Sequence, residues 1–210
     1  MFSTLSSGNV ICHQCGGSTH TPKTARRAHR WRYTYLHLSL RLLTCSRCGT
    51  ATLGADDIAE LKREYARQLR QRAAMAAAAL AGAVSRRQLE LLLGLSQGYL
   101  SKLARGTQPT SASLCSLLSL IAAEPDARLQ ELRHAPRSDC TAALLTLKEH
   151  RSRRRLEALL DLSPGYLSKV AHDDGAHPPS KPLVILLGLL ASQPQRLLEL
   201  ERYWLMTVIK

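Results

Sequence analysis

Four cysteines in two pairs are the residues of this sequence best spaced to do chemistry. Cys12 and Cys15 enclose two residues, and Cys45 and Cys48 repeat that spacing. Two intervening residues let both thiolates of a pair bind one ion at about 2.3 Å, and two pairs complete the tetrahedral coordination of zinc. Because no coordination position stays open, we expect one structural Zn²⁺ that stabilises a module too small to depend on its own core.

Two other roles are open to this cysteine-bearing region. Either pair could act in redox chemistry, although a single redox site needs only one pair. His13 and His20 could compete as zinc ligands, but a surface position is the simpler interpretation for both. The remaining thiols, Cys115 and Cys140, lie in helical contexts and are interpreted as ordinary buried residues.

The segment that separates the two pairs has the alternation of a β-strand. Apolar side chains alternate with polar ones up to Tyr35 and then, shifted by one position, from Leu36 onward. The shift predicts a turn or bulge near Tyr35. Residues 1–55 also contain seven Lys or Arg and no Asp or Glu, so their composition differs from the rest of the chain. We predict a small β zinc module over residues 1–55.

From residue 56 the pattern becomes helical. A connecting helix is predicted over residues 56–72, with Asp56 or Asp57 as its cap. Its apolar residues recur with a period near 3.6, at Ile58, Leu61, Tyr65 and Leu69. The alanine tract 73–79 favours helix, and everything beyond it is typical of short helices broken by Gly and Pro. The predicted fold is therefore mainly α behind a small N-terminal β zinc module.

A long internal repeat organises the helical part. Residues 85–103 overlay residues 152–170 without a gap, and fourteen of the nineteen aligned positions are identical. The match continues, after a two-residue insertion, from 116–125 to 185–194. We interpret it as a duplicated domain, with a first copy over residues 73–136 and a second copy over residues 137–210.

Each copy has the pattern of a helix-turn-helix. In the first, Ser85 is predicted to cap one helix, Gly94 lets the chain leave it, and Ser96 is predicted to cap the next after a three-residue turn. In the second copy Ser163 repeats the cap and Pro164 is placed at the first helical position. Tyr99 and Tyr166 are interpreted mainly as core residues.

The charge of the chain favours a polyanionic partner. The formal net charge is +13 and the pI is near 10, and double-stranded DNA is the first candidate because Lys and Arg release its condensed counterions. The second helix of each copy would enter the major groove. We expect the first copy to make more sequence-specific base contacts and the second to bind mainly through phosphate contacts. The candidate DNA-binding residues are Arg86, Arg87, Gln97, Gly98, Ser101, Lys102, Arg105, Arg153, Arg154, Arg155, Ser168, Lys169 and His172.

The combination resembles a known family. A four-Cys module ending in "LLTCSRCGTATLGADDIAELKREYARQ", followed by "LSKLARGTQPTSASLCSLLSLIAAEPDARLQEL", is similar to the MqsA antitoxins, which join a YgiT-type zinc finger to an XRE/Cro-like helix-turn-helix. The resemblance covers about residues 10–133. It implies zinc at the four cysteines, a cognate toxin bound by the zinc module, and repression of the protein's own operon by a dimer on a palindromic operator. Where that family places Asn and Arg on bases, this chain has Gly98 and Lys102, and the second copy has no counterpart in the short members.

Several alternatives follow from these patterns. The chain could instead be a protein-binding adaptor or antitoxin whose zinc module captures a partner, or a DNA-targeting subunit of a mobile element. An enzyme is not expected, because no acid–base pair or phosphate loop stands out, and His172, Asp173 and Asp174 fall in a predicted loop. The composition predicts no membrane span and a cytoplasmic, nucleoid-associated bacterial protein.

The duplication leaves the assembly open. The two copies could form a covalent pseudo-dimer, or one copy could serve as the surface of a homodimer. The C-terminal stripe is expected either to dock on its own domain or to contact a second chain, and it consists of Leu197, Leu200, Trp204 and Val208.

Overall fold

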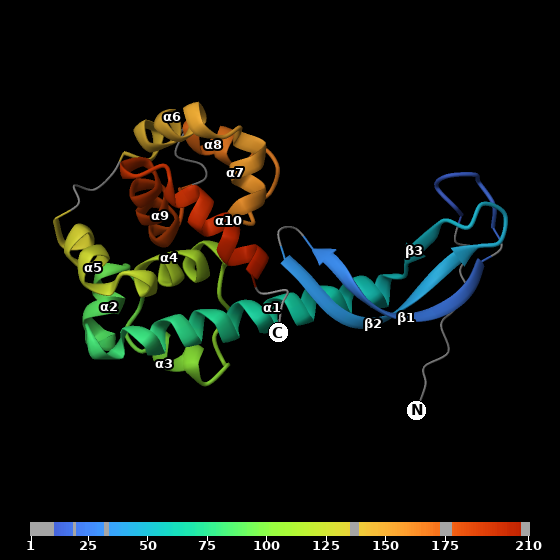
Figure 1. Ribbon diagram of the computed structural model, residues 1–210, viewed down its shortest axis with the longest axis horizontal. Coiled ribbons are helices and arrows are strands. Elements are labelled where there is room, and N and C mark those ends of the chain that lie inside the picture. Colours follow the sequence, from blue (N-terminus) through green and yellow to red (C-terminus); the bar gives the residue numbers. More distant parts are fainter. Residues whose placement is uncertain (1–10, 19, 32–33, 135–138, 173–177, 207–210) are drawn as a thin grey trace. The chain divides into compact units, whose positions relative to one another are not determined.

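The structure of this 210-residue chain is a computed structural model, and it describes residues 11–18, 20–31, 34–134, 139–172 and 178–206 (Figure 1). The chain separates into two compact units. The first, which we call the cysteine unit, comprises Met1–Trp31 and Tyr35–Glu64. The second, the helical unit, comprises Arg32–Thr34 and Tyr65–Lys210.

The cysteine unit contains a three-stranded sheet in the order β1-β2-β3. The strands are β1 (His20–Trp31), β2 (Thr34–Cys45) and β3 (Ala51–Leu53). Strand β3 pairs antiparallel to β2, with Leu53 opposite Leu42. The predicted small N-terminal sheet is therefore confirmed. Strand β1 ends at Trp31 and β2 begins at Thr34, so Tyr35, near which a turn or bulge was predicted, lies in the first residues of β2.

Helix α1 (Ala55–Ala79) joins the predicted connecting helix and the alanine tract in one continuous element. Because the helix begins at Ala55, Asp56 and Asp57 lie in its first turn. Asp57 reaches back from there: its carboxylate accepts hydrogen bonds from the N–H of Gly54 at 3.3 Å and from the N–H of Arg41 in β2 at 2.9 Å. The same side chain thus supplies negative charge at the helix start and ties α1 to the sheet.

The rest of the described chain is helical, as the repeat predicted. The first copy continues from α1 through a short 3₁₀ turn (Leu80–Gly82) and four helices, α2 (Arg86–Leu92), α3 (Tyr99–Ala104), α4 (Ala112–Ala123) and α5 (Pro125–His134). The second copy contains α6 (Cys140–His150), α7 (Arg153–Leu159), α8 (Tyr166–Ala171), α9 (Lys181–Ser192) and α10 (Arg196–Met206). Helices α2 and α7 have 7 residues each, α3 and α8 have 6, and α4 and α9 have 12.

One hydrophobic core runs through both copies. It includes Leu89 and Leu118 from the first copy and Leu156 and Leu186 from the second. The C-terminal stripe docks inside the chain, because Leu197, Leu200 and Trp204 are buried. The guanidinium of Arg72 lies 5.3 Å from the centroid of the Trp204 ring, a cation–π contact between α1 and α10. Val208 lies outside the described residues.

Among the described residues, no helix combines the length and the apolar character needed to cross a bilayer.

Candidate functional site: a four-cysteine cluster and a repeated helix pair

The four predicted ligands come together in one cluster. The sulfurs of Cys12, Cys15, Cys45 and Cys48 all lie within 4.8 Å of one another. The pairs Cys12–Cys48 and Cys15–Cys45 are each separated by 3.6 Å. Four sulfurs bound tetrahedrally at about 2.3 Å from zinc would stand about 3.8 Å apart, whereas a disulfide would need about 2.05 Å. The donor set and its spacing therefore fit one zinc ion.

Each cysteine pair sits on a knuckle of the same backbone shape. The N–H of Gly16 donates to the carbonyl of Cys12 at 2.8 Å, and the N–H of Gly49 donates to the carbonyl of Cys45 at 2.9 Å. Both turns need a positive φ, which is 68° at Gly16 and 72° at Gly49. The repeated turn explains why a glycine follows each pair, and it points the two thiols of each pair to one side.

The electrostatics of the cluster suit a cation. Hydrogen bonds from the Thr50 hydroxyl and N–H lower the pKa of the Cys48 thiol to about 6. The N–H of Cys48 is the main group that lowers the pKa of Cys45. At Cys15 the N–H of Gly17 favours the thiolate, but the neighbouring thiols and burial outweigh it and raise the pKa to about 12. Thiolates this close repel one another, and a divalent ion at the centre would hold all four deprotonated.

The other candidate ligands stay outside this cluster. His13 is exposed, and the ring of His20 lies 3.3 Å from the carbonyl of Ser18. Of the other thiols, Cys115 is buried and Cys140 is half-buried. Among the described residues, the four predicted cysteines are the grouping of His, Cys, Asp and Glu side chains that could hold a metal.

The second candidate site is the helix pair repeated in each copy. Ser85 caps α2 as predicted: its side chain accepts a hydrogen bond from the N–H of Gln88, whose own side chain accepts from the N–H of Ser85. Ser152 caps α7 with its side chain by accepting from the N–H of Arg155. The first helix of each pair therefore begins at the same point of the repeat.

A buried glutamate, which was not predicted from the sequence, binds the start of the second helix of each pair. The carboxylate of Glu90 accepts hydrogen bonds from the N–H groups of Gly98 and Leu100 at 2.9 and 2.8 Å. In the second copy Glu157 accepts from Gly165 and Leu167, both at 2.9 Å. The two side chains are only 4% and 5% exposed. Each carboxylate satisfies N–H groups that the start of a helix leaves unpaired and meets the positive end of the helix dipole.

This clamp replaces the serine caps predicted for α3 and α8. Those helices begin at Tyr99 and Tyr166, so Ser96 and Ser163 are too far upstream to cap them, and Pro164 is not a helical residue. The N-cap positions are Gly98 and Gly165, with φ values of 79° and 80°. The connection therefore spans six residues, Leu93–Gly98, rather than three.

The glycine at each cap is required by its backbone. In the described structure a Cβ on Gly98 or Gly165 would meet no atom within 4 Å, so it is the positive φ that selects glycine. Gly98 is one of the candidate DNA-binding residues predicted from the sequence. Its local geometry is a sufficient reason for a glycine at this position without a ligand.

The candidate DNA-binding residues of the first copy are largely on the surface. Gln97, Lys102 and Arg105 are exposed, and Ser101 is half-buried. Arg86 and Arg87 are exposed at the start of α2. Tyr99 packs against the core and donates its hydroxyl to the carbonyl of Pro109 at 2.7 Å, as its core interpretation predicted.

In the second copy, part of the basic set is engaged within the protein. Arg155 and Arg151 lie 3.1 and 3.4 Å from one carboxylate oxygen of Glu201. Arg153 donates to the hydroxyl of half-buried Ser168 at 3.4 Å. Arg154, Lys169 and His172 are exposed, and Arg155 is exposed as well although it is paired with Glu201. The second copy therefore offers less uncompensated positive charge beside its helix pair than its sequence implies.

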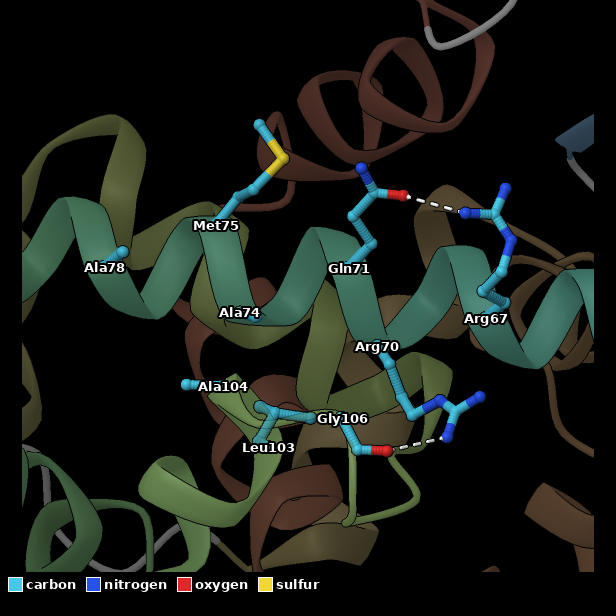
Figure 2. Close-up of a pocket in the computed structure, with 9 residues that line it drawn as sticks. All are labelled: Arg67, Arg70, Gln71, Ala74, Met75, Ala78, Leu103, Ala104 and Gly106. Carbon is cyan, nitrogen blue, oxygen red and sulfur yellow. Dashed lines mark hydrogen bonds between the residues drawn. The ribbon is translucent and has the colours of Figure 1, made fainter.

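A groove of about 580 Å³ runs along the open side of α3, between that helix and α1 (Figure 2). Its apolar lining includes Met75, Leu103 and Ala104. At one end Arg70 donates to the carbonyl of Gly106 at 2.9 Å. Arg70 thus satisfies a carbonyl just past the end of α3, while Glu90 satisfies N–H groups at its start. Helix α3 is held at both ends and keeps its outer face uncovered.

No protein-family profile, curated protein or solved structure matches this chain.

Proposed function

We propose that this chain is a zinc-containing, sequence-specific DNA-binding transcriptional regulator, a repressor of antitoxin type acting at the bacterial nucleoid. In this proposal the pairs α2–α3 and α7–α8 are tandem XRE/Cro-like helix-turn-helix units. The observation that carries it is the exposed basic side of α3, with Lys102 in the helix and Arg105 at its C-cap, on an element fixed at both ends by Glu90 and Arg70. A fixed helix can place side chains on base edges, since readout needs a set register against the groove.

Charge supports the same conclusion. The exposed arginines at the start of α2 would serve as phosphate contacts beside α3, and the net charge of +13 favours any nucleic acid at low salt. The four-cysteine cluster would hold one structural Zn²⁺, which stabilises the cysteine unit and leaves no open position for catalysis.

Duplexes selected from a random pool test this proposal. The double variant Lys102→Ala with Arg105→Ala should weaken binding to the selected duplex by at least tenfold. It should also relax the preference for particular base pairs at the contacted positions, as expected for side chains that reach base edges. Arg133→Ala with Lys148→Ala is the matched control, because it removes the same charge from exposed positions on α5 and α6. Equal losses in both variants would show that binding is unspecific attraction to the whole surface.

The ranking of the two copies is tested in the same assay. Lys169→Ala with His172→Ala should cost less affinity than the variant in α3, because the second copy keeps fewer uncompensated charges. Equal losses in the two copies would contradict that ranking.

The cysteine unit supports a second candidate role, capture of a protein partner. It forms a compact unit of its own, and residues 1–55 are strongly basic. The MqsA resemblance suggests a cognate toxin as that partner, and the basic charge of residues 1–55 would favour a toxin with an acidic surface. Deletion of residues 1–55 tests this role. The role is excluded if the truncated chain represses its promoter equally well and the full chain binds no toxin encoded beside it.

A further inference from the structure

The two copies are packed against each other through equivalent elements. Helix α4 of the first copy packs on α9 of the second, and these two 12-residue helices occupy the same place in the repeat. When identical or equivalent surfaces meet, the contact is of the isologous kind, in which each contact has a partner related by a two-fold axis. The individual contacts can be checked against that rule.

The turns after α2 and α7 make the first exchanged pair of contacts. The carbonyl of Leu160, in the turn after α7, is 3.5 Å from the hydroxyl of Ser113 at the start of α4. The equivalent turn after α2 lies against the start of α9, because a Cβ on Gly94 would stand 3.2 Å from the Cβ of Lys181. The turn of each copy therefore lies against the first residues of the other copy's 12-residue helix, α4 or α9.

The fifth helices make the second exchanged pair. Helix α5 packs against the end of α9: Glu131 accepts a hydrogen bond from the hydroxyl of Ser192 at 2.8 Å, and Arg128 donates to Gln193 at 3.3 Å. In the opposite direction α10 packs on α4, where Tyr203 lies beside Ser119. Helix α5 thus contacts α9 of the second copy, and α10 contacts α4 of the first.

The arrangement of the helical unit in Figure 1 agrees with these contacts. Helices α4 and α9 lie side by side, with α2 and α7 at opposite corners around them and α5 and α10 on opposite sides. A half-turn about an axis close to the line of sight exchanges the members of each pair. The same half-turn exchanges α3 and α8 (Figure 1). Rotation about an axis leaves the height along it unchanged, so a two-fold relation places the two helices at the same height along that axis.

We propose that a single chain binds a single duplex site composed of two unequal half-sites, with α3 on one and α8 on the other. The pseudo-two-fold axis of the protein would coincide with the dyad of the DNA, as the axis of a homodimer does on a palindrome. This proposal rests on the DNA-binding function above. The half-sites are unequal because the outer residues differ: Gln97 and Arg105 of the first copy become Pro164 and His172 in the second.

The packing between the copies also holds α3 and α8 in a fixed position relative to each other. The guanidinium of Arg196 is 1% exposed and binds the carboxylate of Glu131 at 2.8 and 3.1 Å, across the contact between the copies. A buried, two-point arginine–carboxylate pair fixes orientation as well as distance. The half-sites must then keep one spacing, near one helical turn or a multiple of it.

The test uses the full chain with zinc and the duplex selected from a random pool. Sedimentation of the complex should give one chain per duplex, and the selected motif should have two different halves. Protection of each half of the motif against nuclease cleavage reports which helix binds it. Lys102→Ala with Arg105→Ala should remove protection from one half, and Lys169→Ala should remove it from the other. Arg133→Ala with Lys148→Ala should leave both halves protected.

Spacing decides the matter. Inserting five base pairs between the halves turns one half by about half a helical turn, which should lower affinity at least tenfold, to that of one half-site. Two chains on a symmetric motif, no effect of Lys169→Ala, or tolerance of the insertion would overturn this inference and leave the DNA-binding function standing. Failure to select any duplex would instead remove the DNA-binding function, and this inference with it.

Discussion

The buried glutamate clamp gives the sharpest test of how the helix pairs are held. Glu90→Gln keeps the size of the side chain but leaves one carbonyl oxygen for the N–H groups of Gly98 and Leu100. The new amide group faces the second N–H, so one buried donor loses its acceptor. Losing a buried acceptor costs about 1–3 kcal/mol, and exchanging the other charged hydrogen bond for a neutral one costs about 1 kcal/mol more. We therefore expect a loss of about 3 kcal/mol in the free energy of unfolding.

Urea unfolding followed by circular dichroism measures this loss, because the helices dominate the signal. With a slope of about 2 kcal/mol per molar urea, a loss of about 3 kcal/mol lowers the midpoint by about 1.5 M. Glu157→Gln should give a shift of the same size, since its contacts repeat those of Glu90. Glu149→Gln is the control, because it removes the same charge from an exposed position on α6. If Glu90→Gln moved the midpoint no further than Glu149→Gln, the clamp would contribute nothing to stability.

Three further predictions concern the metal, the core and the ion pair between the copies. Cys45→Ser with Cys48→Ser should reduce zinc, measured by mass spectrometry, from one equivalent to none and unfold the cysteine unit while the helices persist; a folded, metal-free cysteine unit would contradict the zinc assignment. Trp204→Ala should lower the free energy of unfolding by about 3–5 kcal/mol, because the ring is 2% exposed, and a loss below about 1 kcal/mol in urea would show that α10 is not part of the core. Burial alone would raise the pKa of the Glu131 carboxyl, but hydrogen bonds from Arg196 and Ser192 hold it below its ordinary value. The stability it contributes is therefore present at neutral pH and lost as pH falls below about 4, and Glu131→Gln should flatten that part of the pH–stability curve.

The sequence was sufficient for features that depend on spacing along the chain. The CxxC pairs predicted a cluster because two residues between ligands fix their local geometry, and Cys12, Cys15, Cys45 and Cys48 do come together. The repeat predicted helices of matching length because identical residues make identical local choices. The cap at Ser85 was predicted from its residue type and position, and the N–H that it binds, that of Gln88, is only three residues away.

Features that depend on contacts between distant residues could not be predicted from the sequence. Ser96 looked like a cap because serine favours that position, but the N–H groups at the start of α3 were taken by Glu90, eight and ten residues upstream of the groups it binds. A glutamate on the apolar face of a predicted helix, present in both copies, was the available signal. The internal pairing of Arg155 with Glu201 had no such signal, since 46 residues separate the two side chains.

The two copies agree where the backbone must be held and differ where a duplex would be met. Glu90 and Glu157 make the same two hydrogen bonds, and Gly98 and Gly165 adopt the same left-handed conformation. Two identical chains related by a two-fold axis can only present equal faces, so they suit a palindrome. A duplication within one chain keeps the axis but frees each face to change. In the proposed mode of DNA binding, the joined arrangement therefore lets a nearly symmetric pair of helices meet an asymmetric target within one chain.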